Sequence, residues 1–179
     1  MITVTCVCVP GPGNYTLDHV ERLRKMVAEH LSLDFDFQCI TESPWPGWWS
    51  KIQIFAPGRF TGRVLYLDLD VTVVGNLDEV IAYPAVFACA KDPLNKGINS
   101  SVMVWDAGTQ NHIFQKFTPV VMELMNGDQD WINKVSLPSR FPKDWFPSYK
   151  FDLKRDLSNV SANTKAILFT GKPKPWDIQ

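Results

Sequence analysis

Two aspartates separated by one residue, Asp68 and Asp70, are the side chains in this sequence best suited to chemistry. They follow the apolar run 63–67, which predicts a buried strand, and a second apolar run comes after them. Two carboxylates at the end of a buried strand cost free energy unless a partner compensates them. Carboxylate oxygens are ligands that Mg²⁺ and Mn²⁺ prefer. The pair therefore predicts a metal-assisted site for a phosphate-bearing substrate, and a structural helix cap or ion pair is the alternative.

Two classes of enzyme place such a pair of carboxylates after a strand. In sugar transfer from a nucleotide sugar, a metal bridges the carboxylates and the diphosphate and stabilises the leaving group. In a haloacid-dehalogenase-type phosphatase, the first motif is an apolar strand followed by Asp-x-Asp-x-Thr, which residues 68–72 match. In that case Asp68 is the nucleophile and Asp70 the general acid/base.

Length and composition predict one globular domain that spans residues 1–179. A chain of this length buries about 70% of its unfolded surface on folding. Hydrophobic residues make up 45% and charged residues 21%, a balance typical of globular proteins. The net charge of −1 argues against a nucleic-acid partner.

The chain also lacks the signals of export and membrane insertion. No run reaches the roughly 18 apolar residues of a membrane span, and residues 1–9 carry no charged start of a signal peptide. The four cysteines do not have metal-binding or redox spacing, so we expect reduced thiols. These features predict a cytoplasmic protein.

Alternating strands and helices predict an α/β fold with a mostly parallel, Rossmann-like sheet flanked by helices. The expected strands are residues 2–9, 35–40, 63–67, 85–90, 101–105 and 166–169. The expected helices are one that follows Thr16, then 50–56, 77–82, 111–125 with an interruption at Pro119, and 128–134. Residues 137–150, rich in proline and aromatic side chains, are expected to be mostly loop. Ligands bind such sheets at the carboxyl ends of strands, where Asp68 and Asp70 fall.

Four segments, in order along the chain, resemble the GT-A glycosyltransferases related to glycogenin and the bacterial lipopolysaccharide galactosyltransferases. Their Asp-x-Asp strand and the turn after it resemble LYLDLDVTVVGNLDEV, residues 65–80. Their Asn-(Ala/Ser)-Gly-Val segment resembles INSSVMVWD, residues 98–106, and their Asp-Gln-Asp segment resembles GDQDWIN, residues 127–133. Their terminal His-Phe-x-Gly-x-x-Lys-Pro-Trp motif resembles FTGKPKPW, residues 169–176. A phosphatase would not require the last two segments.

The resemblance implies a GT-A fold and a donor site built around the two aspartates. Asp68 and Asp70 would hold Mn²⁺ or Mg²⁺, with Asp68 also near the ribose. Lys51 would contact the donor, where relatives carry a basic residue, and an exposed solvated lysine is the alternative. Lys174 would neutralise the diphosphate as a point charge. The remaining donor-binding positions that we expect are Val9, Pro10, Asp92, Asn99 and Gly171; for Asn99 a turn-forming role is the alternative.

The resemblance also implies a retaining transfer of a hexose from UDP-glucose or UDP-galactose to a glycan or other hydroxyl acceptor. Asp128 would accept hydrogen bonds from sugar hydroxyls, with helix capping as the alternative. Gln129 would lie beside the anomeric carbon. Because Gln129 is a poor nucleophile, we favour an ion-pair-like displacement on one face of the sugar, supported by position and electrostatics.

One departure from the family motif concerns the metal. Relatives place a histidine ligand immediately before the terminal Phe, and this chain has Leu168 there. Metal binding would then rest on two carboxylates, the diphosphate and water. A binding module that has lost its activity is therefore a further alternative.

The acceptor site is expected in two aromatic segments, because the chain has little room for the additional segments of its relatives. These segments are residues 45–49 and 137–149. The side chains expected to stack on sugar rings, or otherwise to pack the core, are Trp45, Trp48, Trp49, Trp145 and Tyr149.

Overall fold

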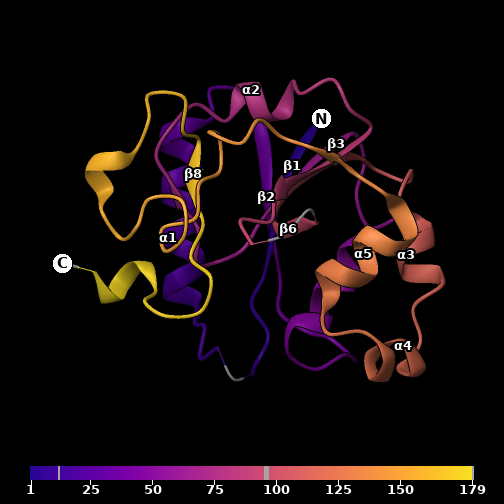
Figure 1. The fold of residues 1–179 in the computed structure, drawn as a ribbon. Helices are drawn as coiled ribbons and strands as arrows, with labels where there is room; N and C mark the ends of the chain where they lie inside the picture. The colour runs from indigo at the N-terminus through magenta and orange to yellow at the C-terminus, as the bar shows by residue number, and fades with distance from the viewer. Residues whose placement is uncertain (12, 95–96, 179) are drawn as a thin grey trace.

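The computed structural model describes residues 1–11, 13–94 and 97–178, and a six-stranded sheet forms their centre (Figure 1). The strand order is β2-β1-β3-β6-β5-β7. The strands are β1 (Ile2–Val7), β2 (Phe35–Ile40), β3 (Arg63–Leu67), β5 (Phe87–Lys91), β6 (Ile98–Asp106) and β7 (Ser139–Arg140). A separate two-stranded ribbon pairs β4 (Thr72–Val73) with β8 (Ala166–Ile167).

The sheet is mixed, with one strand reversed. β1 pairs with β2 and β3 in parallel, and β7 pairs with β5 in parallel. β6 lies between β3 and β5 and is antiparallel to both. The predicted α/β fold with a mostly parallel sheet is confirmed, and β6 is its reversed element.

Helices cover the sheet on both sides. α1 (Leu17–His30) and β8 lie on one side of the strands, and α3 (Asn111–Gln115), α4 (Pro119–Leu124) and α5 (Asp128–Ser136) lie on the other (Figure 1). α2 (Asp78–Ile81) and the 3₁₀ helices η1 (Gly47–Phe55), η2 (Leu157–Asn159) and η3 (Pro175–Asp177) complete the described elements. Among these helices, none is both long and apolar enough to cross a bilayer.

The interruption predicted at Pro119 is confirmed, since α3 ends at Gln115 and α4 begins at Pro119, where a missing N–H costs nothing. Other predicted bounds were wrong for identifiable physical reasons. The strand predicted at 101–105 begins earlier, at Ile98, so Asn99 lies within β6. β4 and β7 were missed because strands of two residues carry no periodic signal.

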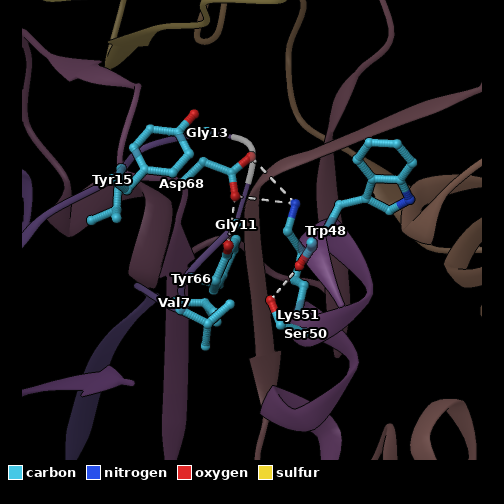
Figure 2. A pocket seen from close by; sticks show the side chains of 12 residues that line it. Val7, Gly11, Gly13, Tyr15, Trp48, Ser50, Lys51, Tyr66 and Asp68 are labelled. Atoms are coloured by element: carbon cyan, nitrogen blue, oxygen red, sulfur yellow. Dashed lines mark hydrogen bonds and ion pairs between the residues drawn. The ribbon is translucent and has the colours of Figure 1, made fainter. Parts of the chain in front are cut away.

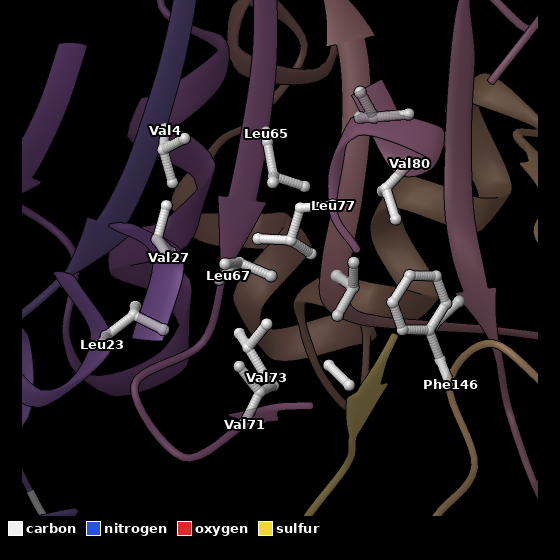
Figure 3. Packing of buried hydrophobic residues seen from close by; sticks show 14 of the residues in the cluster. Val4, Leu23, Val27, Leu65, Leu67, Val71, Val73, Leu77, Val80 and Phe146 are labelled. Atoms are coloured by element: carbon white, nitrogen blue, oxygen red, sulfur yellow. The ribbon is translucent and has the colours of Figure 1, made fainter. Parts of the chain in front are cut away.

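Each face of the sheet packs on its own hydrophobic cluster. Along β3, Leu65 and Leu67 enter the cluster beneath α1 and α2, whereas Val64 and Tyr66 enter the cluster beneath η1, α3 and α5. This alternation follows from the two-residue period of a strand. Figure 3 shows the first cluster, in which Leu77 lies beside Leu67. Asp68 therefore follows Tyr66 on the face that carries the second cluster.

Replacing Leu77 with alanine should lower the free energy of unfolding by about 2–5 kcal/mol, because Leu77 is fully buried and a cavity would remain. The matched control is Leu124→Ala on α4, where the side chain is 72% exposed and the change should stay within about 0.5 kcal/mol. Guanidinium chloride unfolding of the two variants measures the difference. Equal losses of unfolding free energy in the two variants would contradict the burial of Leu77 in the first cluster.

Candidate functional site

The position of the Asp68 carboxylate is set by β3, the strand that ends immediately before it. β3 ends at Leu67, and Asp68 N donates to Ser101 O at 2.9 Å, which extends the pairing with β6 by one residue. Tyr66 and Asp68 share one face of the chain, and Tyr66 Oη donates to Asp68 Oδ1 at 2.5 Å. The carboxylate therefore has a defined orientation before any ligand binds.

Lys51 is the buried cation at the centre of this site. η1 carries it beneath the end of β3, where its Nζ lies 3.1 Å from Asp68 Oδ1 and 3.1 Å from Asp128 Oδ2. Its Nζ also donates to Ser100 Oγ at 3.0 Å. Figure 2 shows the ammonium pointing to Asp68. One side chain thus joins η1, β3, β6 and α5.

Electrostatics keep this ammonium charged. Burial lowers the pKa of Lys51, but the carboxylates of Asp128 and Asp68 outweigh that effect and raise the pKa above its usual value. Burial also raises the pKa of the Tyr66 hydroxyl, and the charge of Asp68 raises it further. Tyr66 consequently donates its hydrogen bond to Asp68 as a neutral phenol at ordinary pH.

Ser100 reaches Lys51 because the pairing of β5 with β6 is irregular. Cys89 pairs with Met103, whereas the next residue, Ala90, pairs with Asn99. The residues between them on β6 bulge from the regular ladder, which is how such irregularities redirect side chains near sites. Ser100 Oγ donates to Asp128 Oδ2 at 2.6 Å, so the bulge connects the sheet with the first residue of α5.

Asp70 belongs to a second polar group, at the turn after β3. Its Oδ2 accepts a hydrogen bond from Tyr15 Oη at 2.9 Å and one from Lys174 Nζ at 2.5 Å. Burial raises the pKa of Asp70 above its usual range, and the charge of Asp68 raises it too, while Lys174 and Tyr15 act in the opposite direction. Lys174 therefore offsets part of the effect of burial on the pKa of Asp70.

A cavity of about 360 Å³ opens between the end of β1, the loop that follows it, and η1. Tyr15 and Trp48 stand on opposite sides of the view, and Asp68 and Lys51 lie between them (Figure 2). Trp48 is 57% exposed. The lining also includes Val7, Val9, Gly11, Gly13, Gly47, Ser50, Tyr66 and Leu69. The cavity therefore lies at the carboxyl ends of β1 and β3, where α/β sheets bind ligands.

The predicted site residues fall into groups. Val9, Lys51 and Asp68 line the cavity, and Pro10 adjoins Val9 in the same loop. Asp128 reaches the cavity through Lys51. The alternative of an exposed, solvated lysine at position 51 is wrong, because the side chain is 8% exposed.

Beside β5 and β6, and outside the cavity lining, lie the predicted residues Gln129, Asp92 and Asn99. Gln129 Nε2 donates to Asp92 Oδ2 at 3.4 Å, which joins α5 to the end of β5. Asn99 Oδ1 accepts from Ser101 N at 2.9 Å, so its amide supports the irregular segment of β6. Gly171 lies in the terminal turn with φ of +72°, a backbone conformation that favours glycine.

Most of the aromatic side chains predicted to stack on sugars pack inside the protein instead. Trp49 and Tyr149 are buried, and Trp45 packs edge-on against Phe117 in the second cluster. Trp145 packs against the first cluster. Trp48 differs because its indole lines the cavity.

Three residues of the site were missed from the sequence. Tyr66 precedes the two aspartates in the strand, and its position on the face of Asp68 could have indicated a hydrogen bond. Ser100 lies within the family-like segment 98–106 but gave no separate signal. Tyr15 stands in an irregular loop, so only the folded chain brings it to Asp70.

The side chains around the two aspartates are a poor set of ligands for a divalent cation. Among the residues described, no three His, Cys, Asp or Glu side chains form a group that could hold a metal ion. Both oxygens of Asp68 contact Lys51, and Asp70 accepts from Lys174. Leu168, at the position of the family histidine, is buried in the first cluster. The donor set does not fit Mn²⁺ or Mg²⁺, and the predicted metal site is not confirmed.

Solved glycosyltransferases share this fold. The glycosyltransferase GlyE of Streptococcus pneumoniae TIGR4 aligns with a TM-score of 0.74 and 15% identity, over 100% of this chain and 57% of GlyE. The galactosyltransferase LgtC, in complex with donor and acceptor sugar analogues, aligns with a TM-score of 0.71 and 14% identity, over 97% of this chain and 89% of LgtC. The bifunctional glycosyltransferase WbbM aligns with a TM-score of 0.69 and 13% identity, over 98% of this chain and 46% of WbbM.

These similarities establish the predicted GT-A fold, which is the fold of a class of glycosyltransferases. The chain spans 57% of the length of GlyE and 46% of the length of WbbM. No family model matches the sequence, and no curated protein sequence matches it. The likeness is therefore one of structure.

Replacing Lys51 with methionine should lower the free energy of unfolding by about 3–5 kcal/mol, because Asp128 would keep a buried charge, and Asp68 a partly buried one, without a cation. The control is Lys25→Met on the exposed side of α1, which should stay within about 0.5 kcal/mol. Adding Asp128→Asn to Lys51→Met should cost less than the sum of the single changes, since the two groups interact directly. Denaturant unfolding of the wild type, the three single variants and the double variant measures these differences. Additive losses would show that the two groups are not coupled.

Proposed function

We propose that this chain is a glycosyltransferase that moves a hexose from a UDP-sugar, UDP-glucose or UDP-galactose, to a hydroxyl group of a glycan or similar acceptor. The observation that carries the proposal is the cavity at the carboxyl ends of β1 and β3, with Asp68 and Lys51 between Tyr15 and Trp48. Its volume of about 360 Å³ lies within the range of small-molecule sites. The shared fold of GlyE and LgtC adds support.

The donor's parts have chemically suitable partners along this cavity. Tyr15 offers an aromatic edge for the nucleoside, and Asp68 offers a carboxylate for ribose hydroxyls. The diphosphate requires a positive charge, which Lys174 supplies beside Asp70. With these roles, each of the three side chains contacts one part of the donor, and no helix or strand has to move.

The transfer itself depends on the two residues that begin α5. Asp128, held by Ser100 and Lys51, would accept hydrogen bonds from sugar hydroxyls and orient the ring. Gln129, which contacts Asp92, would lie beside the anomeric carbon. An amide is a weak nucleophile, so we favour retention through an ion-pair-like displacement in which the leaving diphosphate assists the incoming hydroxyl.

The acceptor would approach over Trp48. A Cβ atom added to Gly127 would lie 3.8 Å from Trp48 Nε1, so the indole adjoins the residue that precedes Asp128. An exposed indole is a suitable platform for a sugar ring. Trp48 therefore joins the donor cavity to the start of α5.

The two alternatives make different demands on the chain. The phosphatase requires a haloacid-dehalogenase-type fold, whereas GlyE, LgtC and WbbM, which share the fold of this chain, are glycosyltransferases. A binding module without activity would use the same cavity and bind UDP, but it would not turn over a UDP-sugar. Turnover is therefore the measurement that separates it from an enzyme.

Replacing Gln129 with alanine should lower the turnover of UDP-glucose or UDP-galactose by up to about tenfold, because one polar contact at the reacting carbon is lost. The release of UDP measures turnover, either to water or to an added glycan. Gln115→Ala on the exposed side of α3 is the matched control and should leave the rate unchanged.

Two results would contradict the proposal. UDP binding without UDP release from either sugar nucleotide would identify the inactive binding module. Hydrolysis of an aryl phosphate that Gln129→Ala leaves unchanged would instead favour the phosphatase, since that chemistry does not involve α5.

A further inference from the structure

The ion pair of Lys174 with Asp70 stands where the sequence predicts a divalent cation. The pair is largely buried, with side-chain exposures of 18% for Lys174 and 10% for Asp70. The Lys174 ammonium also lies 5.9 Å from the ring centre of Tyr15, a side chain that lines the cavity. A fixed positive charge is therefore present at the wall of the proposed donor site.

The segment that carries Lys174 is anchored on both of its sides. Asp177 Oδ2 accepts from Lys174 N at 2.8 Å and from Lys172 Nζ at 2.9 Å, which closes the turn at η3. Trp176 packs against His19 of α1 with ring centres 4.2 Å apart, and it meets the edge of Tyr15 at 6.0 Å. The ammonium is thus pre-organised, and less entropy is lost when it binds a ligand than a lysine on a free tail would lose.

A divalent cation at this place would have to compete with two ammonium groups. Lys51 contacts both oxygens of Asp68, and Lys174 and Tyr15 both donate to Asp70 Oδ2. Mg²⁺ requires near-octahedral oxygen coordination, and the side chain at the family's histidine position is the buried Leu168. Positive charges on Lys51 and Lys174 would also repel the ion.

We propose that Lys174, held by Asp70, replaces the divalent cation, so that this chain binds the diphosphate of its donor without metal. The inference rests on the proposed function and concerns the same cavity. A lysine ammonium has three N–H donors, and one that bonds Asp70 can turn others to phosphate oxygens. The carboxylate, the ammonium and the diphosphate would then form the same chain of alternating charges that a carboxylate, a metal and a diphosphate form.

Calorimetric titration of UDP into the protein, first with EDTA and then with added Mg²⁺ or Mn²⁺, tests this inference. The dissociation constant with EDTA should lie within about threefold of the constant with metal. Lys174→Gln should weaken binding in EDTA at least about tenfold, because a charged hydrogen-bond donor to phosphate is lost. Lys143→Gln, at a lysine that is 72% exposed, pairs with Asp152 and does not line the cavity, should leave the constant nearly unchanged.

Each other outcome has a definite meaning. Binding that requires metal would overturn the inference and leave the UDP-sugar site standing, whereas no binding under any condition would overturn both. Unchanged binding by Lys174→Gln in EDTA would also overturn the inference. Lys174→Arg, which keeps the charge, should bind UDP in EDTA more tightly than Lys174→Gln, and thermal unfolding checks that every variant is folded.

Discussion

The ion pairs of the buried Lys51 ammonium are the interactions on which the rest of the site depends. The ammonium compensates Asp68 at the end of β3 and Asp128 at the start of α5, two carboxylates that come from distant parts of the sequence. Without a cation between them, these charges would repel each other in a region shielded from water. The ion pairs therefore do more than hold η1 against the sheet: they set the distance between the donor cavity and the residues proposed to orient the sugar.

A second pair of charges, Lys174 with Asp70, joins the end of the chain to the turn after β3. The two groups have the same arrangement. Each aspartate of the motif accepts one hydrogen bond from a lysine and one from a tyrosine. This arrangement stabilises the carboxylates within the protein itself. It also places positive charge on the protein side of the proposed diphosphate site, which is the physical basis for the inference that no metal is needed there.

The alternation of strands and helices was sufficient to predict the α/β fold, because periodicity is a local signal. The motifs also singled out Lys51, Asp128 and Lys174, which the structure places in ion pairs near the end of β3, and their roles toward a donor stay predictions. The irregular pairing at Ala90 was not predictable, since it depends on how β5 and β6 meet. The burial of most of the aromatic side chains predicted to stack on sugars was likewise not predictable. Composition gives the number of aromatic residues, but only the packed structure shows which of them are buried. The contacts of Lys51 show the same limit. The basic residue of relatives at this position predicted contact with the sugar donor, whereas in the structure the ammonium contacts two carboxylates of its own chain.

A proton–nitrogen correlation spectrum titrated with UDP tests most directly whether the cavity between Tyr15 and Trp48 holds a nucleoside diphosphate. We expect the signals of the Trp48 indole N–H and of the Gly11 and Gly13 amides to shift together with one dissociation constant. Signals on the far side of the molecule, such as that of Leu124 on α4, should stay in place. An absence of shifts, or shifts confined to residues outside the cavity, would contradict the binding of a nucleoside diphosphate in this cavity.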